Sequence, residues 1–160
     1  MSSLIINLDD LYQLRQNYRK TKGYGKVEPI RCEAIAQIVE IEFTDIVNES
    51  FEDIYRCVMR IRNVPTMNVI SKLKNPDLGI TITVDGKVYE SLYHQRGENC
   101  GKGDMCQFSL VLWNPMEGDE ETPGIWEAVD ISPLTLNDVE YTCKFLSSDF
   151  GQQFLETHTP

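Results

Sequence analysis

The segment His94–Cys106 holds the densest group of side chains that could do chemistry in this 160-residue chain. It combines the imidazole of His94, the thiols of Cys100 and Cys106 and the amine of Lys102 with three glycines. Imidazole and thiolate groups bind zinc, but a structural zinc site usually has four ligands, with cysteines paired two residues apart. Five residues separate these cysteines, so the spacing predicts no metal site.

The same segment carries an incomplete phosphate-binding pattern. The spacing from Gly97 to Gly101 and Lys102 is one residue short of a Walker A loop, and Gly103 stands where a Ser or Thr would bind magnesium. A Walker loop also leads into a helix, whereas a strand is expected to follow here. Nucleotide binding is therefore not predicted, and no cofactor is expected.

Catalysis lacks a complete set of groups. His94 is the histidine best placed to act as a base, because His158 lies almost at the end of the chain. Cys100 is too close to His94 in sequence for the spacing to assign it as a nucleophile. We therefore expect no catalytic residues and a protein that is not an enzyme. The alternative is a small enzyme, or a metal or thiol module, centred on His94–Cys106.

The formal net charge of −10 is distributed unevenly. Residues 1–102 contain 14 basic and 14 acidic residues, whereas residues 103–160 contain 11 acidic residues and a single basic one, Lys144. The stretch Arg15–Arg31 carries six basic residues and one acid. A molecule polarised in this way attracts partners of opposite charge, and its acidic side repels nucleic-acid phosphates.

The charge distribution suggests a non-enzymatic binding protein whose acidic C-terminal surface blocks a basic partner that handles nucleic acid. Carboxylates on a rigid surface compete with phosphates for Lys and Arg side chains, as in inhibitors of the immunity-protein or phage anti-defence type. The expected contact residues are six acids and one apolar anchor: Glu117, Asp119, Glu120, Glu121, Glu127, Asp130 and Trp126. Direct binding to nucleic acid or membranes is not expected. The sequence leaves open whether Arg15–Arg31 neutralises the acidic surface internally.

Hydrophobic periodicity predicts the order of the elements. Two predictions rest on specific signals. Ser50 and Asp53 form a capping box ahead of a helical stripe over residues 51–62, and Asp85-Gly86 lies between two alternating runs, which is typical of a hairpin. The full expectation is a helix after Asn7, a short helix or extended segment at 29–36, a strand at 38–47, a helix at 51–62, a hairpin at 80–89, strands at 107–113 and 125–131, a helix capped by Thr135, and a last helix at 149–156.

This order predicts an α+β fold, with an antiparallel sheet of about four to five strands and helices packed on one face. A single globular domain over residues 1–160 is expected from the length. Five cysteines without a basic, apolar leader at the N-terminus favour a cytoplasmic protein with free thiols. Cys32, Cys57 and Cys143 lie in apolar segments, so we expect them to be buried.

Overall fold

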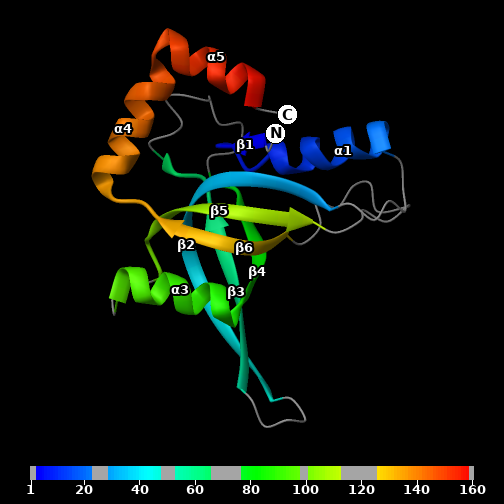
Figure 1. Cartoon of the computed structure of the whole chain (residues 1–160), viewed down its shortest axis with the longest axis vertical. Helices are drawn as coiled ribbons and strands as arrows, with labels where there is room; N and C mark the ends of the chain where they lie inside the picture. The colour runs from blue at the N-terminus through cyan, green and yellow to red at the C-terminus, as the bar shows by residue number, and fades with distance from the viewer. Residues whose placement is uncertain are drawn as a thin grey trace.

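The computed structural model describes residues 3–22, 29–47, 53–65, 77–97, 101–112 and 126–158. Figure 1 shows a central group of strands with α3 at one end and α1, α4 and α5 around the other, where both termini lie. The elements in chain order are β1 (Ser3–Ile5), α1 (Asp10–Lys22), β2 (Ile30–Val47), β3 (Asp53–Arg62), β4 (Gly79–Asp85), α3 (Gly86–Arg96), β5 (Met105–Leu112), β6 (Trp126–Pro133), α4 (Leu136–Ser147) and α5 (Asp149–His158).

The strand β2 is the element through which the sheet closes. Its first part, Ile30–Gln37, pairs antiparallel with β5, and its second part, Gln37–Val47, pairs antiparallel with β3. β3 then pairs with β4, β4 pairs parallel with β6, and β6 pairs antiparallel with β5. The five strands β2-β3-β4-β6-β5 thus form a closed mixed barrel, and β1 adds a short parallel pairing with β2.

The predicted open antiparallel sheet with helices on one face is therefore wrong. The sheet closes on itself, one of its barrel pairings is parallel, and the helices contact different strands: α3 contacts β3, β4 and β6, whereas α5 contacts β1. Alternation along a strand shows which residues face the core, but it does not show which strand lies alongside. Closure also pairs the backbone N–H and C=O groups that the edge strands of an open sheet would leave without partners.

The barrel interior mixes small and large side chains. Ala34 and Ala36 of β2 share one core cluster with the bulky side chains of Met59, Phe108 and Trp126, and each of these five residues is at most 1% exposed. Small side chains beside large ones allow a narrow barrel to fill without voids. The core is therefore built from the inward positions of every barrel strand.

The segment predicted as a helix over residues 51–62 is the strand β3, so that prediction is wrong. Cys57, Met59 and Ile61 point into the core, while Arg60 is exposed, which is the alternation of a strand. The spacing of the apolar residues fits the periodicity of a helix as well as that of a strand. Antiparallel pairing with β2 on one side and β4 on the other makes this segment a strand. The predicted capping residue Ser50 lies outside the described residues.

The Asp85-Gly86 pair begins a helix instead of turning a hairpin. The strand before it, β4, was predicted, but Asp85 has φ −65° and ψ 147°, whereas a type I′ turn needs a positive φ there. The Asp85 side chain accepts a hydrogen bond from the backbone N–H of Lys87 at 2.8 Å, and so caps α3. Asp-Gly is favoured in both settings, which is why the sequence alone suggested the hairpin.

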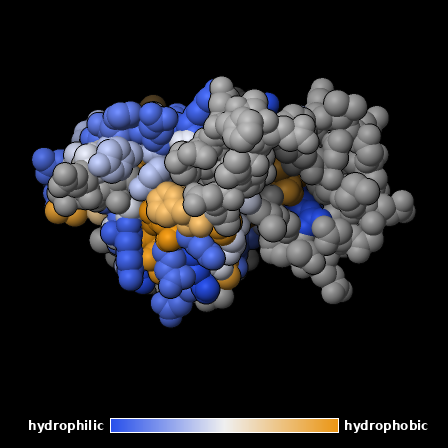
Figure 2. Space-filling view, turned by 90° about the horizontal axis from the view of Figure 1, so that it is seen from below, coloured by the Kyte–Doolittle hydropathy of each residue, from blue (hydrophilic) through white to orange (hydrophobic). Residues whose placement is uncertain are grey.

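α3 lies across one end of the barrel. Figure 2 looks at the molecule from that end, where hydrophobic side chains gather near the centre, with hydrophilic ones around them. Phe43 of β2, which is 53% exposed, packs edge-on against Tyr89 of α3, with ring centroids 4.9 Å apart. Val88 and Tyr89 in turn pack against the barrel core, so α3 closes this end.

The other predicted helices are confirmed. Asn7 precedes α1 and accepts a hydrogen bond from the backbone N–H of Asp9 through its side chain at 3.2 Å. Thr135 and Asp138 form the predicted capping box of α4, and α5 follows. The strands predicted at 107–113 and 125–131 correspond to β5 and β6 within the described residues. Residues 30–36 belong to β2, so this segment is extended rather than helical.

A second, smaller core joins the C-terminal helices to the outside of the barrel. It consists of five buried residues from the segment after β1, from β2, from the segment after β3 and from α4: Ile6, Ile35, Val64, Val139 and Leu146. Phe154 and Leu155 of α5 pack against it. Within the described ranges, no helix has both the length and the apolar composition needed to cross a bilayer.

Candidate functional site

The described part of His94–Cys106 contains no group of metal ligands, and its one described thiol is buried. His94 is exposed at the end of α3, 3.5 Å from the Glu90 carboxylate, whereas Cys106 is completely buried in the barrel. Cys100 lies outside the described residues. Among the residues that the structure describes, no three His, Cys, Asp or Glu side chains are grouped to bind a metal ion.

The glycines of this segment shape a turn that is fastened to β2. Gly103 donates a backbone hydrogen bond to the Ile38 carbonyl at 2.8 Å, and Ile38 donates one to the Asp104 carbonyl at 2.9 Å. Gly101 has φ +124°, and its N–H donates to the Asp104 carboxylate at 2.8 Å. A Cβ at Gly101 would lie 2.9 Å from Ile41, so glycine serves packing rather than phosphate binding.

Two of the three thiols that were predicted to be buried are buried. Cys32 and Cys57 are 2% and 1% exposed, as predicted, whereas Cys143 is half-buried. Burial, and next the negative charge of Glu33, raise the pKa of the Cys32 thiol to about 12. Thiolate is the reactive form, so Cys32 is a core residue and not a nucleophile at neutral pH.

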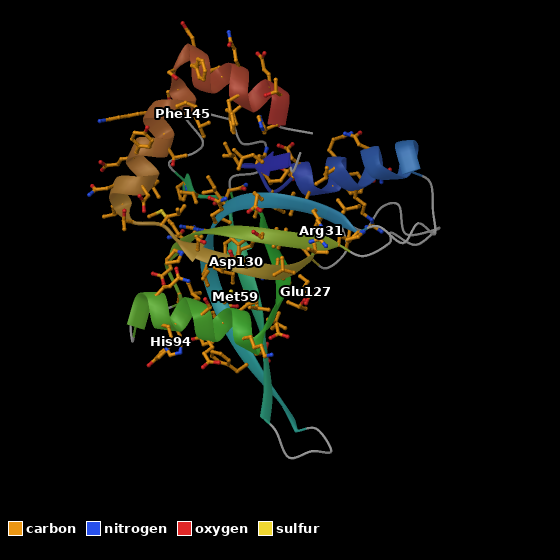
Figure 3. The ribbon with its side chains drawn as sticks, in the orientation of Figure 1. Arg31, Met59, His94, Glu127, Asp130 and Phe145 are labelled. Carbon is orange, nitrogen blue, oxygen red and sulfur yellow. The ribbon has the colours of Figure 1, made fainter. Side chains whose placement is uncertain are left out.

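The predicted acidic contact residues do not form one described surface. Glu117, Asp119, Glu120 and Glu121 lie outside the described residues. Glu127 is half-buried and Asp130 is exposed, both on the outer side of β6, as Figure 3 shows. Arg31 lies across β5 from Glu127, because both are paired with Val111. This side of the barrel therefore carries a positive charge as well as negative ones.

Trp126, the predicted apolar anchor, is a core residue. It is 1% exposed, and its Cα is paired with Ile82 across the parallel β4–β6 contact. A side chain buried in this way cannot insert into a partner. The sequence could not separate the two roles, because an aromatic residue among charged ones is typical of an interface and of a strand with one buried face.

A shallow groove runs over the outer side of β2, β3 and β4 and has a volume of about 490 Å³. Its charged walls combine the carboxylates of Glu40 and Glu42 with the cations Arg60 and Lys102. Across the strands, Glu40 is paired with Arg60, and Arg60 with Thr81. No aromatic residue is among the described residues that line this groove.

The most conspicuous exposed apolar surface lies on α4 and α5. Tyr141 and Phe150 are 75% and 74% exposed. Phe145, at the junction of the two helices in Figure 3, lies 6.4 Å from Phe150 and 6.0 Å from Phe154, measured between ring centroids. His158 stacks on Phe154 at 3.9 Å. We call these five residues the C-terminal aromatic surface.

The helical spacing and one glycine hold this surface together. Tyr141 and Phe145 are four residues apart and so share a face of α4. Gly151 of α5 is buried against the end of α4, where a Cβ would clash with the backbone of Phe145 and Leu146. This close approach lets the two helices meet, so that Phe145 stands between Phe150 and Phe154.

Carboxylates surround the C-terminal aromatic surface. The described parts of α4 and α5 contain four acidic residues, Asp138, Glu140, Asp149 and Glu156, against one lysine, Lys144. Isolated exposed aromatic residues are common, but a contiguous group of large ones marks an interaction site. None of the predicted contact residues belongs to this surface. The spacing of Tyr141, Phe145, Phe150 and Phe154 could have indicated it, since the buried stripe already uses Val139 and Leu146.

The closed barrel defines the fold class. A five-stranded Greek-key barrel whose first strand pairs with the second and the fourth, and whose third pairs with the fifth, is the OB fold. Here these strands are β2 to β6, and α3 lies between the third and the fourth. In other OB folds the side formed by the second and third strands binds oligonucleotides or oligosaccharides.

Comparison with solved structures agrees with this assignment. A chain in the crystal structure of yeast Stn1 and Ten1 superposes with a TM-score of 0.64, over 99% of this chain and 98% of that one, with 16% identical residues. At that identity the likeness establishes the fold and not the activity. No protein-family model matches the sequence. No curated protein matches it either.

These findings overturn the hypothesis of an acidic inhibitor of the immunity-protein or anti-defence type. That hypothesis rested on net charge, whereas the fold is an OB barrel similar to a chain of the Stn1 and Ten1 structure. Net charge carries information about association and solubility but not about fold. The apolar anchor of that hypothesis, Trp126, is also inside the barrel.

Proposed function

We propose that this chain is a non-enzymatic OB-fold subunit that binds another protein through the C-terminal aromatic surface. The observation that carries the proposal is the exposure of Tyr141 and Phe150, which are about three-quarters exposed. Phe150 lies beside Phe145, which shares a face of α4 with Tyr141. Covering two or three aromatic rings supplies much of the binding energy of a typical interface.

The partner that fits is a second protein with an apolar helix flanked by basic residues. We expect the apolar side of the partner helix to pack against the exposed aromatic side chains of α4 and α5. The carboxylates of Glu140 and Glu156 border the surface, so Lys and Arg at the edge of the partner helix are complementary. The yeast structure contains two proteins, Stn1 and Ten1, which supports a second protein as the partner.

Binding of single-stranded nucleic acid in the groove over β2, β3 and β4 is the less well supported function. Sites of this kind combine a positive groove with aromatic side chains on which bases stack. Here Arg60 and Lys102 face Glu40 and Glu42, and the described lining contains no aromatic residue. The fold permits binding of nucleic acid in this groove, but the groove lacks the side chains that such binding uses. The exposed aromatic side chains of α4 and α5 are better suited to binding a protein.

Site-specific photocrosslinking tests the proposal. A photoreactive phenylalanine analogue replaces Tyr141 in one preparation and Tyr93 in another, and each is irradiated in cells that produce the protein. Tyr93 is a matched control, because it is 42% exposed on α3 at the other end of the barrel. We expect one protein to be crosslinked from position 141 and not from position 93, with its crosslinked peptide forming a helix that carries Lys or Arg beside an apolar stripe.

Affinity measurements with that purified partner complete the test. Tyr141→Ala and Phe150→Ala should each weaken binding by about tenfold or more, the loss typical of a central aromatic residue. Tyr93→Ala should leave the dissociation constant unchanged. Equal binding by all three variants would exclude the C-terminal aromatic surface. Binding of an oligonucleotide that is lost in Arg60→Ala and kept in Tyr141→Ala would favour the groove instead.

A further inference from the structure

A groove lies at the start of α4, between this helix and the turn that precedes β5. Its volume is about 570 Å³, and α4 leads from it to α5 (Figure 1). Its apolar lining comes from Met105, Leu134 and Leu136. Since a cavity of roughly 150 Å³ holds a benzene ring, this groove has room for at least two apolar side chains. The rest of the described lining is polar or glycine and comes from Gly103, Asp104, Thr135 and Asn137.

Leu136 stands at the edge of this groove with most of its surface exposed. It is 71% exposed, whereas Val139 and Leu146 of the same helix are buried and form its core-facing side. A single exposed apolar residue is common on a protein surface. Leu136 differs, because it borders the same groove as the half-buried side chains of Met105 and Leu134. The three residues therefore form an apolar patch that a partner can reach.

The second core connects this groove to the C-terminal aromatic surface. Met105 and Leu134, which line the groove, pack against that core. Phe145 and Phe154, which belong to the aromatic surface, pack against it as well. The groove and the aromatic rings are therefore parts of one apolar cluster that reaches the surface in two places.

The exposed side of α4 joins the same two places. Asn137, which lines the groove, is followed by Tyr141 and Phe145 at intervals of four residues, so these side chains form one stripe along the helix. From Leu136 to Phe145 the helix rises by about 14 Å. A partner helix of ordinary length can therefore contact both ends of the stripe at once.

The C-terminal aromatic surface is too small to hold a partner by itself. An aromatic side chain buries about 150–250 Å² when it is fully covered, so two rings that are about three-quarters exposed offer about 220–380 Å². The half-buried rings beside them add less. A stable interface buries roughly 800 Å² on each partner. The partner therefore needs further contacts, and the groove offers apolar ones along the same stripe.

We infer that the partner that covers the C-terminal aromatic surface also inserts one or two aliphatic side chains into the groove at the start of α4. The inserted side chains pack on Met105, Leu134 and Leu136. Asp104 is the charged residue of the described lining, so a Lys or Arg next to the inserted side chains is complementary. The inference rests on the proposed function, because it concerns the same partner and adds a second contact region to its interface.

Photocrosslinking from the groove tests where the partner lies. The photoreactive phenylalanine analogue replaces Asn137 in one preparation and Gln13 in another, and the products are compared with those from position 141. Gln13 is the control, because it is exposed on α1 and belongs to neither contact region. We expect position 137 to crosslink to the same protein as position 141, and position 13 not to do so. A crosslink from position 137 to a different protein, or to a second copy of this chain, would overturn the inference.

Affinity for the purified partner tests the contribution of Leu136. Leu136→Ala should raise the dissociation constant about tenfold, because it removes an aliphatic side chain that becomes buried in the complex. Val129→Ala is the matched control, since Val129 is an aliphatic residue of β6 that is 45% exposed and does not line the groove. It should leave the dissociation constant unchanged. Both variants should keep the melting temperature of the native protein, because neither side chain is buried.

Comparison with Tyr141→Ala separates this inference from the proposed function. Weaker binding by Tyr141→Ala together with unchanged binding by Leu136→Ala would remove the groove from the interface and leave the aromatic surface in place. Unchanged binding by both variants would exclude the groove and the aromatic surface together. Losses of about tenfold in each single variant that combine to about a hundredfold in the double variant would support two separate contact regions for one partner.

Discussion

Thr135 and Asp138 exchange two hydrogen bonds at the start of α4. The backbone N–H of Asp138 donates to the Thr135 hydroxyl at 3.1 Å, and the backbone N–H of Thr135 donates to the Asp138 carboxylate at 2.9 Å. The bond from the Thr135 backbone, and next that from its side chain, lower the pKa of Asp138 below its usual 3.8. This pair fixes the first turn of the helix that carries Tyr141 and Phe145.

The first prediction concerns the pH dependence of this capping box. A carboxyl group whose pKa is lowered in the folded state contributes stability above its unfolded pKa, and that contribution is lost as the pH falls below it. Asp138→Ala should therefore be less stable than the native protein at pH 7. The difference should begin to shrink as the pH falls below 3.8 and should vanish only when the pH has fallen through the lowered pKa of the folded state, where Asp138 also loses its charge. Urea unfolding followed by circular dichroism measures it.

The control for this prediction is Glu140→Ala, which removes an exposed carboxylate from the same helix outside the capping box. Its effect should not follow the same pH profile. Thr135→Ala should lower the free energy of unfolding by about 1 kcal/mol, the usual cost of losing an N-cap side chain. A difference between the native protein and Asp138→Ala that stays constant down to pH 2 would contradict the proposed role of Asp138.

The second prediction concerns Gly151, where α5 meets α4. Gly151→Ala should destabilise the protein by about 1–3 kcal/mol or more, because its methyl group has no space against the Phe145 backbone. The separation of α5 from α4 should remove the ring contacts of Phe145 with Phe150 and Phe154. Nuclear Overhauser effects between these rings report their loss. Gln153→Ala, at an exposed position of the same helix, should leave stability and ring contacts unchanged.

The third prediction concerns alkaline pH and Cys32. The unfolded thiol ionises near pH 9, whereas burial holds the folded thiol neutral up to about pH 12. A group whose pKa is raised on folding contributes stability below its unfolded pKa, and this contribution is lost as the pH rises through the folded one. Between pH 9 and 12, the native protein should lose stability more steeply than Cys32→Ala. Parallel profiles of the two proteins would show that Cys32 is accessible or already ionised.

The fourth prediction tests barrel closure. Residues 30–37 of β2 and 105–112 of β5 pair with each other, and β5 also pairs with β6. Native-state amide hydrogen exchange should therefore be slow along both edges of β5, at rates close to those of β3. In an open sheet ending at β2 or β5, every second amide of the end strand would exchange quickly. That alternating pattern would contradict the closed barrel.

An element could be predicted from the sequence where residues within that element specify it, and could not where distant strands decide it. α4 was predicted correctly because Thr135 and Asp138, three residues apart, specify its start. β3 was not, because Ile54, Val58 and Ile61 satisfy a helical spacing as well as a strand, and its partners β2 and β4 decide the outcome. Ile30 pairs with Leu112 where the barrel closes. The hydrophobic pattern around neither residue indicates that the two strands are partners.

The residues of the candidate site could likewise be predicted only in part, because their grouping depends on contacts between separate elements. Net charge directed attention to Glu127, Asp130 and the acids before them, but charge counts do not reveal which side chains share a surface. Phe145 and Phe150 are brought within 6.4 Å by the turn between two helices, which depends on the close approach at Gly151. The aromatic spacing along α4 and α5 was visible in the sequence. That Tyr141 and Phe150 stay exposed became visible only with the fold.

β2 pairs with β3, which follows it directly, and with β5, which is synthesised much later, and this sets the order in which the chain can fold. When the ribosome has produced β2, β3 and β4, these strands can already pair as neighbours, whereas Ile30–Gln37 must wait until β5 has been synthesised. Contacts so distant along the chain form slowly, because the intervening loop loses its freedom first. Until then the nascent chain exposes an unpaired apolar strand, and a message truncated before β5 yields a product prone to aggregation.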